Sequence, residues 1–90
     1  MITVYSMPHC ASCNKLKKYL LDKKINYKEV DISTNNFAAR YLIEKTGVRI
    51  VPDLEIDESI LVGFNKKDVE CAINAYFMIN KNKMTVWLYE

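Results

Sequence analysis

Four segments of the chain are short runs rich in β-branched and aromatic residues, the pattern typical of β-strands. They cover residues 2–5, 27–32, 53–56 and 60–62. Only Asp57, Glu58 and Ser59 separate the last two runs. Because so short a connection permits only an antiparallel hairpin, we expect these two strands to pair with each other.

Between the strands, apolar residues recur every three or four positions, which is the spacing of one face of a helix. Cys13, Leu16 and Leu20 form such a line in the first of these segments. The predicted helices cover residues 11–24, 35–46 and 66–79. Residues that favour helix ends flank them, so we expect capping by Ser33 or Thr34, by Asn65, and by Gly47 as a stop signal.

The predicted order of elements is β-α-β-α-β-β-α, which indicates a single α/β domain over residues 1–79. The first two crossovers each contain a helix, so the first two strands are expected to be parallel, and the hairpin adds antiparallel strands. We therefore expect a mixed four-stranded sheet with helices on both faces. The chain shows no internal repeat, linker or low-complexity segment.

Residues 80–90 form a predicted C-terminal extension. The sequence Asn80-Lys81-Asn82-Lys83 interrupts the helical pattern, and Met84–Tyr89 has the composition of a strand. An exposed apolar tail would promote aggregation. We therefore expect this segment to dock as an extra strand, either on the sheet edge or across a dimer.

Composition and charge exclude several classes of protein. The chain has 90 residues, of which 50% are hydrophobic and 27% charged, with a net charge of +2. These values are ordinary for a globular domain and do not favour nucleic-acid binding. No apolar run approaches the ~20 residues of a membrane span, and no secretory leader is evident, so we expect a cytoplasmic protein. Lysines gather in residues 15–24 and 66–83, which predicts solvated helix faces or a docking surface for an acidic partner.

The candidate chemistry lies at Cys10 and Cys13. In a cytosolic protein, a close cysteine pair is more typical of redox chemistry or metal binding than of a structural disulfide. Cys10 stands at the predicted start of a helix, where free backbone N–H groups and the helix dipole lower the pKa of a thiol. We expect Cys10 to be the nucleophile. Cys13, one turn inside the helix and on its apolar line, suits the resolving role.

A metal site is the main alternative for this pair. Structural zinc requires four ligands, and the remaining candidates are His9, which adjoins Cys10, and the distant Cys71. We therefore expect no metal, with Cys71 acting as a small buried hydrophobic residue. His9 is expected in an exposed turn, where its protonated form could stabilise the Cys10 thiolate. Ser12, between the cysteines, is expected to influence the reduction potential.

Val51-Pro52, just before the third strand, is the second notable feature. Proline is tolerated at the first position of a strand because it has no N–H to donate to the ladder. A cis Val51-Pro52 bond would turn the Val51 backbone toward the open side of the sheet. Its N–H and C=O could then pair with an extended substrate segment beside Cys10.

With these features the chain resembles the glutaredoxins of the thioredoxin fold, and among them the short NrdH-redoxins. The similar segments are ITVYSMPHCASC, INYKEVDIS, IVPDL and LVGF. The resemblance implies a dithiol–disulfide oxidoreductase in which Cys10 attacks and Cys13 resolves. It also implies that Pro52 is the cis-proline of a substrate groove whose far wall is Gly63 and Phe64.

The resemblance also bears on the electron donor. Glutathione-using glutaredoxins usually have a basic residue before the first cysteine, an aromatic residue inside the motif, and a Thr-Asp or Ser-Asp pair after the Gly-rich turn. The corresponding places here hold Met7, Ala11-Ser12 and Asn65-Lys66. A lysine cannot accept a hydrogen bond from the glutathione amine. The expected donor is therefore thioredoxin reductase, with no bound cofactor.

The resemblance further implies protein disulfides as substrates, such as that of ribonucleotide reductase. The tail lies outside the part that resembles the family, and from it we expect a monomer or a weak dimer formed through the tail. Two other functions stay open: a glutathione-dependent glutaredoxin, and a redox-sensing or metal-binding adaptor with the same fold. The resemblance to arsenate reductases and Spx-like proteins is weaker. Those proteins are longer and carry an arginine next to the proline.

Overall fold

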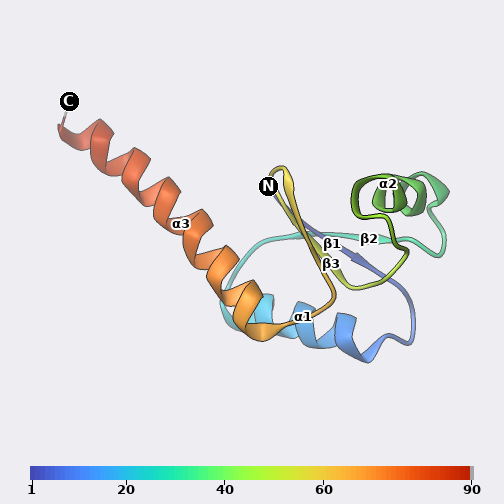
Figure 1. Cartoon of the computed structure of the whole chain (residues 1–90). Coiled ribbons are helices and arrows are strands. Elements are labelled where there is room, and N and C mark those ends of the chain that lie inside the picture. The colour runs from blue at the N-terminus through green and yellow to red at the C-terminus, as the bar shows by residue number, and fades with distance from the viewer. Residues whose placement is uncertain (90) are drawn as a thin grey trace.

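A computed structural model describes the backbone of residues 1–89 and the side chains of residues 1–77. In this part of the chain the elements follow the predicted order (Figure 1). The strands are β1 (Ile2–Ser6), β2 (Lys28–Asp31), β3 (Asp53–Ile56) and β4 (Ser59–Val62). The helices are α1 (Ala11–Asp22), α2 (Asn36–Thr46) and α3 (Lys66–Tyr89). None of them is long and apolar enough to cross a membrane.

The strands form one mixed sheet in the order β2-β1-β3-β4. β1 and β2 are parallel, with Val4 opposite Glu29. β3 is antiparallel to both β1 and β4, with Asp53 between Tyr5 on one side and Val62 on the other. The predicted parallel pair, the hairpin and the four-stranded sheet are therefore confirmed.

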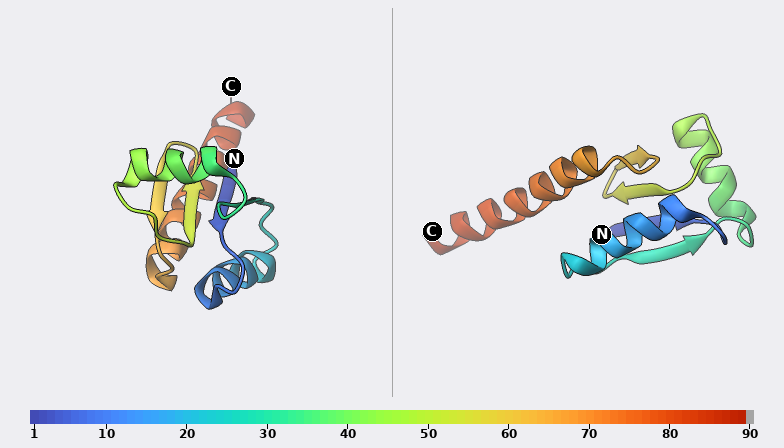
Figure 2. Two further views of the ribbon diagram at one scale, coloured as in Figure 1. Left: turned by 90° about the vertical axis from the view of Figure 1, so that its right-hand side faces the viewer. Right: turned by 90° about the horizontal axis from the view of Figure 1, so that it is seen from below.

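The two faces of the sheet carry separate hydrophobic clusters, because neighbouring residues of a strand point to opposite sides. On one face, Val4 and Leu54 pack with residues of α1 and α3, namely Leu16, Leu20, Val69 and Ile73. On the other face, Tyr5 and Ile32 pack with Ala39 and Leu42 of α2. Helices α1 and α3 thus cover one face and α2 the other, as expected (Figure 2).

The start of α2 differs from the prediction, because Ser33 and Thr34, the expected caps, form hydrogen bonds with Asp31 instead. The Ser33 backbone N–H and hydroxyl both donate to Asp31 Oδ1, at 2.8 and 2.6 Å, and the Thr34 hydroxyl donates to the Asp31 carbonyl. Asn35 is the cap instead, and its Oδ1 accepts the Ala38 N–H at 3.0 Å. At the other end, Gly47 stops the helix with φ +82°, a conformation that glycine adopts at little cost.

The predicted C-terminal strand is wrong. Residues 84–89 continue α3, a helix of 24 residues whose C-terminal half extends away from the sheet (Figure 1). Residues 80–83 contain neither proline nor glycine, and ordinary residues cost a helix at most about 0.7 kcal/mol each. This stretch is therefore too weak a signal to end α3, and the predicted boundary after residue 79 lies inside the helix. The oligomeric state stays a prediction.

The predicted cap of α3 is confirmed and can be tested. Asn65 Oδ1 accepts the backbone N–H groups of Lys67 and Asp68, at 3.0 and 3.2 Å. Asn65→Ala is expected to lower the free energy of unfolding by about 1 kcal/mol, because both N–H groups lose this partner. Urea denaturation measures the change. The control is Asn74→Ala at an exposed site of α3, which should not destabilise the protein. Equal losses in both variants would show that the cap contributes nothing specific.

Candidate active site

Three connections meet at one end of the sheet, where β1 and β4 end and β3 begins. Residues 7–10 follow β1, Val51-Pro52 precedes β3, and Gly63-Phe64 follows β4. Since β1 and β4 both pair with β3, these connections lie side by side at the same end. The Gly63 N–H donates to the Pro52 carbonyl at 2.7 Å. This hydrogen bond joins two of the segments that the sequence singled out.

Cys10 and Cys13 lie at this end of the sheet and form a disulfide bond, with their Cα atoms 5.2 Å apart. Cys10 is the N-cap residue of α1. Its Sγ accepts the Cys13 N–H at 3.1 Å, and its carbonyl accepts the Asn14 N–H at 3.1 Å. Cys10 is partly exposed, whereas the Cys13 side chain has 0% exposure. The two sulfur atoms therefore differ in access and in hydrogen bonding.

This difference has a direct chemical consequence. After reduction, a thiolate at the Cys10 position can keep the Cys13 N–H as a donor and lies at the positive end of the α1 dipole. Both effects favour the charged form of the Cys10 thiol. The buried Cys13 is accessible to Cys10 rather than to a large substrate. The geometry agrees with the expected nucleophilic and resolving roles, which stay predictions.

An ion pair holds α1 against the sheet. Lys17 Nζ and Ser6 Oγ both donate to Glu29 Oε2, each at 2.8 Å. The hydrogen bond from Lys17, followed by that from Ser6, holds the pKa of the Glu29 carboxyl below its ordinary value. These contacts connect α1, β1 and β2. With Leu16 fully buried on the next turn after Cys13, they fix the position of the cysteine-bearing end of the helix.

The Val51-Pro52 peptide bond is cis, as the substrate-groove hypothesis expects. Pro52 is buried, and Val51 is half-buried against the cluster that contains Tyr5 and Leu42. Packing therefore holds both residues in place. Their role in holding a substrate stays a prediction.

Gly63 and Phe64 differ in what they offer to a groove. Gly63 has φ +77°, in the left-handed region that favours glycine, and lies next to Pro52 through the hydrogen bond above. Phe64 is half-buried and packs against the cluster beneath α1 and α3. Only the exposed part of the Phe64 ring can contact a substrate. The role of Gly63 and Phe64 as the far wall of a groove stays a prediction.

The remaining candidate residues, His9, Ser12 and Cys71, are all exposed. His9 and Ser12 are exposed, and neither side chain forms a hydrogen bond to another described residue. His9 has φ +60°, in agreement with the predicted turn. Cys71 is exposed, so its predicted burial is wrong. Cys71 comes two residues after the buried Val69, and two residues correspond to a rotation of about 200° around the helix axis, so the two side chains lie on different sides of α3. In the described part of the chain, no three His, Cys, Asp or Glu residues lie together as a metal site.

Asp53, which sequence reasoning did not single out, is an unusual residue at this end of the sheet. It follows Pro52, has 0% exposure, and neither of its carboxylate oxygens has a hydrogen-bond partner in the described residues. Burial raises the pKa of this carboxyl to about 6. Its register opposite Tyr5 places it on the face covered by α2. An acidic residue at the start of a central strand was the signal that could have identified it.

Glu55, two residues along β3, shares this face but has partners. The hydroxyl groups of Tyr5 and Tyr41 both donate to its carboxylate, the first at 2.7 Å. Burial, with a contribution from Glu55, raises the pKa of Tyr5. Asp53 and Glu55 thus lie on the same face of β3, but only Glu55 has hydrogen bonds that compensate for its burial.

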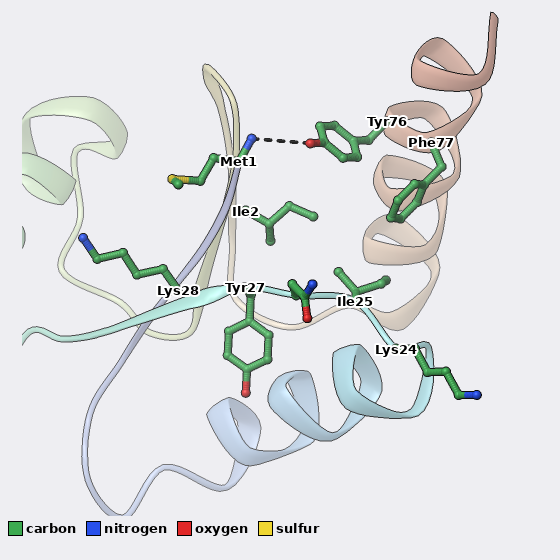
Figure 3. Close-up of a pocket in the computed structure, with 9 residues that line it drawn as sticks. Met1, Ile2, Lys24, Ile25, Tyr27, Lys28, Tyr76 and Phe77 are labelled. Carbon is green, nitrogen blue, oxygen red and sulfur yellow. Dashed lines mark hydrogen bonds between the residues drawn. The ribbon is translucent and has the colours of Figure 1, made fainter. Parts of the chain in front are cut away.

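A cavity of about 530 Å³ lies at the opposite end of the sheet (Figure 3). Its walls come from the start of β1, the connection between α1 and β2, and α3, where Tyr76 and Phe77 line it. The Met1 amine donates to the Tyr76 hydroxyl at 3.4 Å beside it. No cysteine lines this cavity. The candidate active site is therefore the cysteine end of the sheet and not this cavity.

Comparison with known proteins identifies the family to which the chain belongs. A family model described as Glutaredoxin matches residues 2–61, a range that contains both disulfide cysteines and Pro52. The chain belongs to the glutaredoxin family. As a glutaredoxin-like protein it has the thiol-disulfide oxidoreductase fold with its CxxC pair in place, as its sequence predicts.

Relatives and solved structures refine this assignment. A glutaredoxin-like 8.6 kDa protein in the rubredoxin operon of Clostridium pasteurianum is 37% identical over 73 residues, which is 78% of this glutaredoxin-like chain and 93% of that protein. The glutaredoxin-like protein NrdH of Lactococcus lactis subsp. cremoris is 30% identical over 69 residues, or 77% and 94% of the two chains. The crystal structure of the thioredoxin-like protein BC3987 has a TM-score of 0.73 and 26% identity, with 78% and 96% covered. These similarities confirm the thioredoxin fold and the predicted resemblance to NrdH.

Proposed function

We propose that this protein is a dithiol–disulfide oxidoreductase that reduces protein disulfides and receives its own electrons from thioredoxin reductase. The observation that carries the proposal is the asymmetry of the cysteine pair. The Cys10 sulfur lies at the α1 N-terminus and accepts a backbone N–H, and the Cys13 sulfur is buried one turn away. A reactive, accessible thiol beside a sheltered one suits a two-step exchange.

In the proposed cycle, the Cys10 thiolate attacks one sulfur of a substrate disulfide. A Cys10–substrate disulfide forms, and the other substrate sulfur leaves as a thiolate that takes a proton from solvent. Cys13 then loses its proton and attacks the Cys10 sulfur, which releases the second substrate thiolate. The substrate has gained two electrons, and the protein holds the Cys10–Cys13 disulfide. Two electrons from the reductase restore the dithiol.

The neighbouring segments are proposed to hold the substrate during this exchange. An extended peptide beside Cys10 would pair with the Val51 backbone next to Pro52 and contact Gly63 and the exposed part of Phe64. The hydrogen bond from Gly63 to Pro52 supports a continuous groove between these segments. His9 and Ser12 remain candidate modulators of the Cys10 thiolate and of the potential, respectively.

The choice of electron donor rests on groups that a glutathione site would need. The Asn65 amide oxygen already accepts two N–H groups of α3, and Lys66 beside it cannot accept from an ammonium group. Met7 is apolar where a basic residue would bind a glutathione carboxylate. The similarity to NrdH proteins supports the same choice, and supports ribonucleotide reductase as one substrate. The cycle requires a reducing compartment such as the cytoplasm.

The electron donor can be identified by insulin-disulfide reduction followed through NADPH oxidation. We expect turnover with thioredoxin reductase, and at least about tenfold slower turnover with glutathione and glutathione reductase, a difference that corresponds to about 1.4 kcal/mol in the barrier. Equal turnover with glutathione would instead identify a glutathione-dependent glutaredoxin. No turnover with either donor, together with stoichiometric zinc or an iron–sulfur cluster in the reduced protein, would identify a metal-binding adaptor.

A further inference from the structure

The end of the sheet that carries the cysteine pair is unusually rich in positive charge. Three segments form this end of the sheet and the helix starts beside it: residues 7–15, 47–52 and 63–67. None of the three contains an aspartate or a glutamate, although the whole chain has 11 acidic residues. Four of their exposed cations lie close in sequence to the proposed site, and we call them the cationic rim: Lys15, Arg49, Lys66 and Lys67.

The cations of this rim are available to a partner. Among residues whose side chains the structure describes, ion pairs join only the Met1 amine to Asp57 and Lys17 to Glu29. No member of the cationic rim is in either pair. The positive ends of α1 and α3 lie at the same end of the sheet and add to the field.

The acidic residues at this end of the sheet compensate for the rim only in part. Asp31, at the end of β2, accepts two hydrogen bonds from Ser33, and Asp68 lies in the first turn of α3. Asp53 is fully buried beside Pro52. Other acidic residues, such as Asp57 and Glu58, lie in the β3–β4 turn at the opposite end. The surface around the cysteines therefore has an excess of positive charge.

Exposed apolar side chains accompany this charge. Met7, Val48, Ile50 and Val62 each expose more than a third of their surface. Met7 precedes the cysteines, Val48 and Ile50 precede the cis-proline, and Val62 is the last residue of β4, directly before Gly63. Apolar contacts surrounded by charge are typical of surfaces that bind a polypeptide, and single small disulfides do not require them.

We propose that the substrate of this site is an acidic polypeptide segment, in which carboxylates flank the disulfide and contact the cationic rim. This inference rests on the proposed function and specifies its substrate class. Opposite charges on the two surfaces accelerate association, and salt weakens the effect. The rim thus selects by charge before Cys10 reacts.

The test uses two synthetic peptides with the same disulfide loop, one with Asp and Glu beside the cysteines and one with Asn and Gln. The protein is reduced beforehand and freed of reductant, so that no reductase is needed, and the second-order rate of disulfide transfer is measured. Dithiothreitol reduces both peptides in parallel, because flanking carboxylates change the intrinsic reactivity of the disulfide itself. The rate relative to dithiothreitol then reports recognition by the protein.

We expect this relative rate to be about tenfold higher for the acidic peptide at low salt, and the advantage to fall at high salt. Lys66→Gln/Lys67→Gln should remove most of the advantage. The matched control is Lys23→Gln/Lys24→Gln, which removes the same charge at the opposite end of α1. Equal relative rates for the two peptides, or equal losses in both variants, would overturn the inference. Reduction of neither peptide would overturn the proposed function, and this inference with it.

Discussion

A Cys10→Ser variant is expected to show no disulfide-reductase turnover with either electron donor. A serine hydroxyl cannot form the disulfide that links enzyme and substrate, and it does not ionise near neutral pH. The loss should therefore be complete and not partial. Insulin reduction measures this directly. Turnover close to that of the unmodified protein would exclude Cys10 as the nucleophile.

The other two cysteines provide the comparison that makes this result specific. Cys13→Ser leaves the attacking thiol in place and removes the group that resolves the intermediate, so a Cys10–substrate disulfide should accumulate. Mass spectrometry under non-reducing conditions detects it. Cys71→Ser removes an exposed thiol of α3 and should keep full turnover. Accumulation of the same adduct without the Cys13 substitution would contradict the resolving role of Cys13.

The second large effect is expected in the pH dependence of stability, through Asp53. Its carboxyl is buried without a hydrogen-bond partner, and its folded-state pKa of about 6 lies above the ordinary value of 3.8. Well below pH 3.8 the carboxyl is protonated in both the folded and the unfolded chain, and its burial has no pH-dependent effect on the free energy of unfolding. As the pH rises from about 4 to about 6, the unfolded chain releases this proton while the folded chain still holds it, and above that range both are ionised and the effect is constant. Stability therefore falls, by about 3 kcal/mol in total.

Asp53→Asn should remove this dependence. Urea denaturation of the oxidised protein from pH 4 to 8 is expected to give a flatter profile, and the variant should gain relative to the unmodified protein as the pH rises. Asp22→Asn, at the exposed end of α1, removes one surface carboxylate and is the matched control. The same pH profile in Asp53→Asn and in the unmodified protein would show that the Asp53 carboxyl does not cause the pH dependence of stability.

Local contacts explain which features could be predicted from the sequence. The Asn65 cap and the Gly47 stop depend on backbone groups within three or four residues, and both predictions were correct. The Ser33 or Thr34 cap was wrong because Asp31, also nearby, binds both residues. Two local hydrogen-bonding patterns competed for the same residues. Propensities alone do not rank such patterns.

Helix geometry explains one further error, and the dependence of strands on a partner strand explains another. Cys71 looked apolar enough to be buried, but the face of α3 that contacts the sheet is set by Val69 and Ile73, and Cys71 lies on another side. The strand predicted for residues 84–89 would have required a partner strand. Since β-branched residues favour strands mainly through cross-strand contacts, the composition of the tail did not determine its structure.

The sequence by itself determined the order of the elements, the parallel and antiparallel pairings, and the position of Cys10 at a helix start. These features follow from hydrophobic periodicity, from connection lengths and from capping residues, all of which act over short distances along the chain. Only the tertiary structure decided that Pro52 and Gly63 are joined, that Asp53 is buried without a partner among the described residues, and that the cationic rim lies at the same end of the sheet as the cysteines. Each of these depends on strands and helix ends that are distant in sequence and that meet only when the sheet has formed.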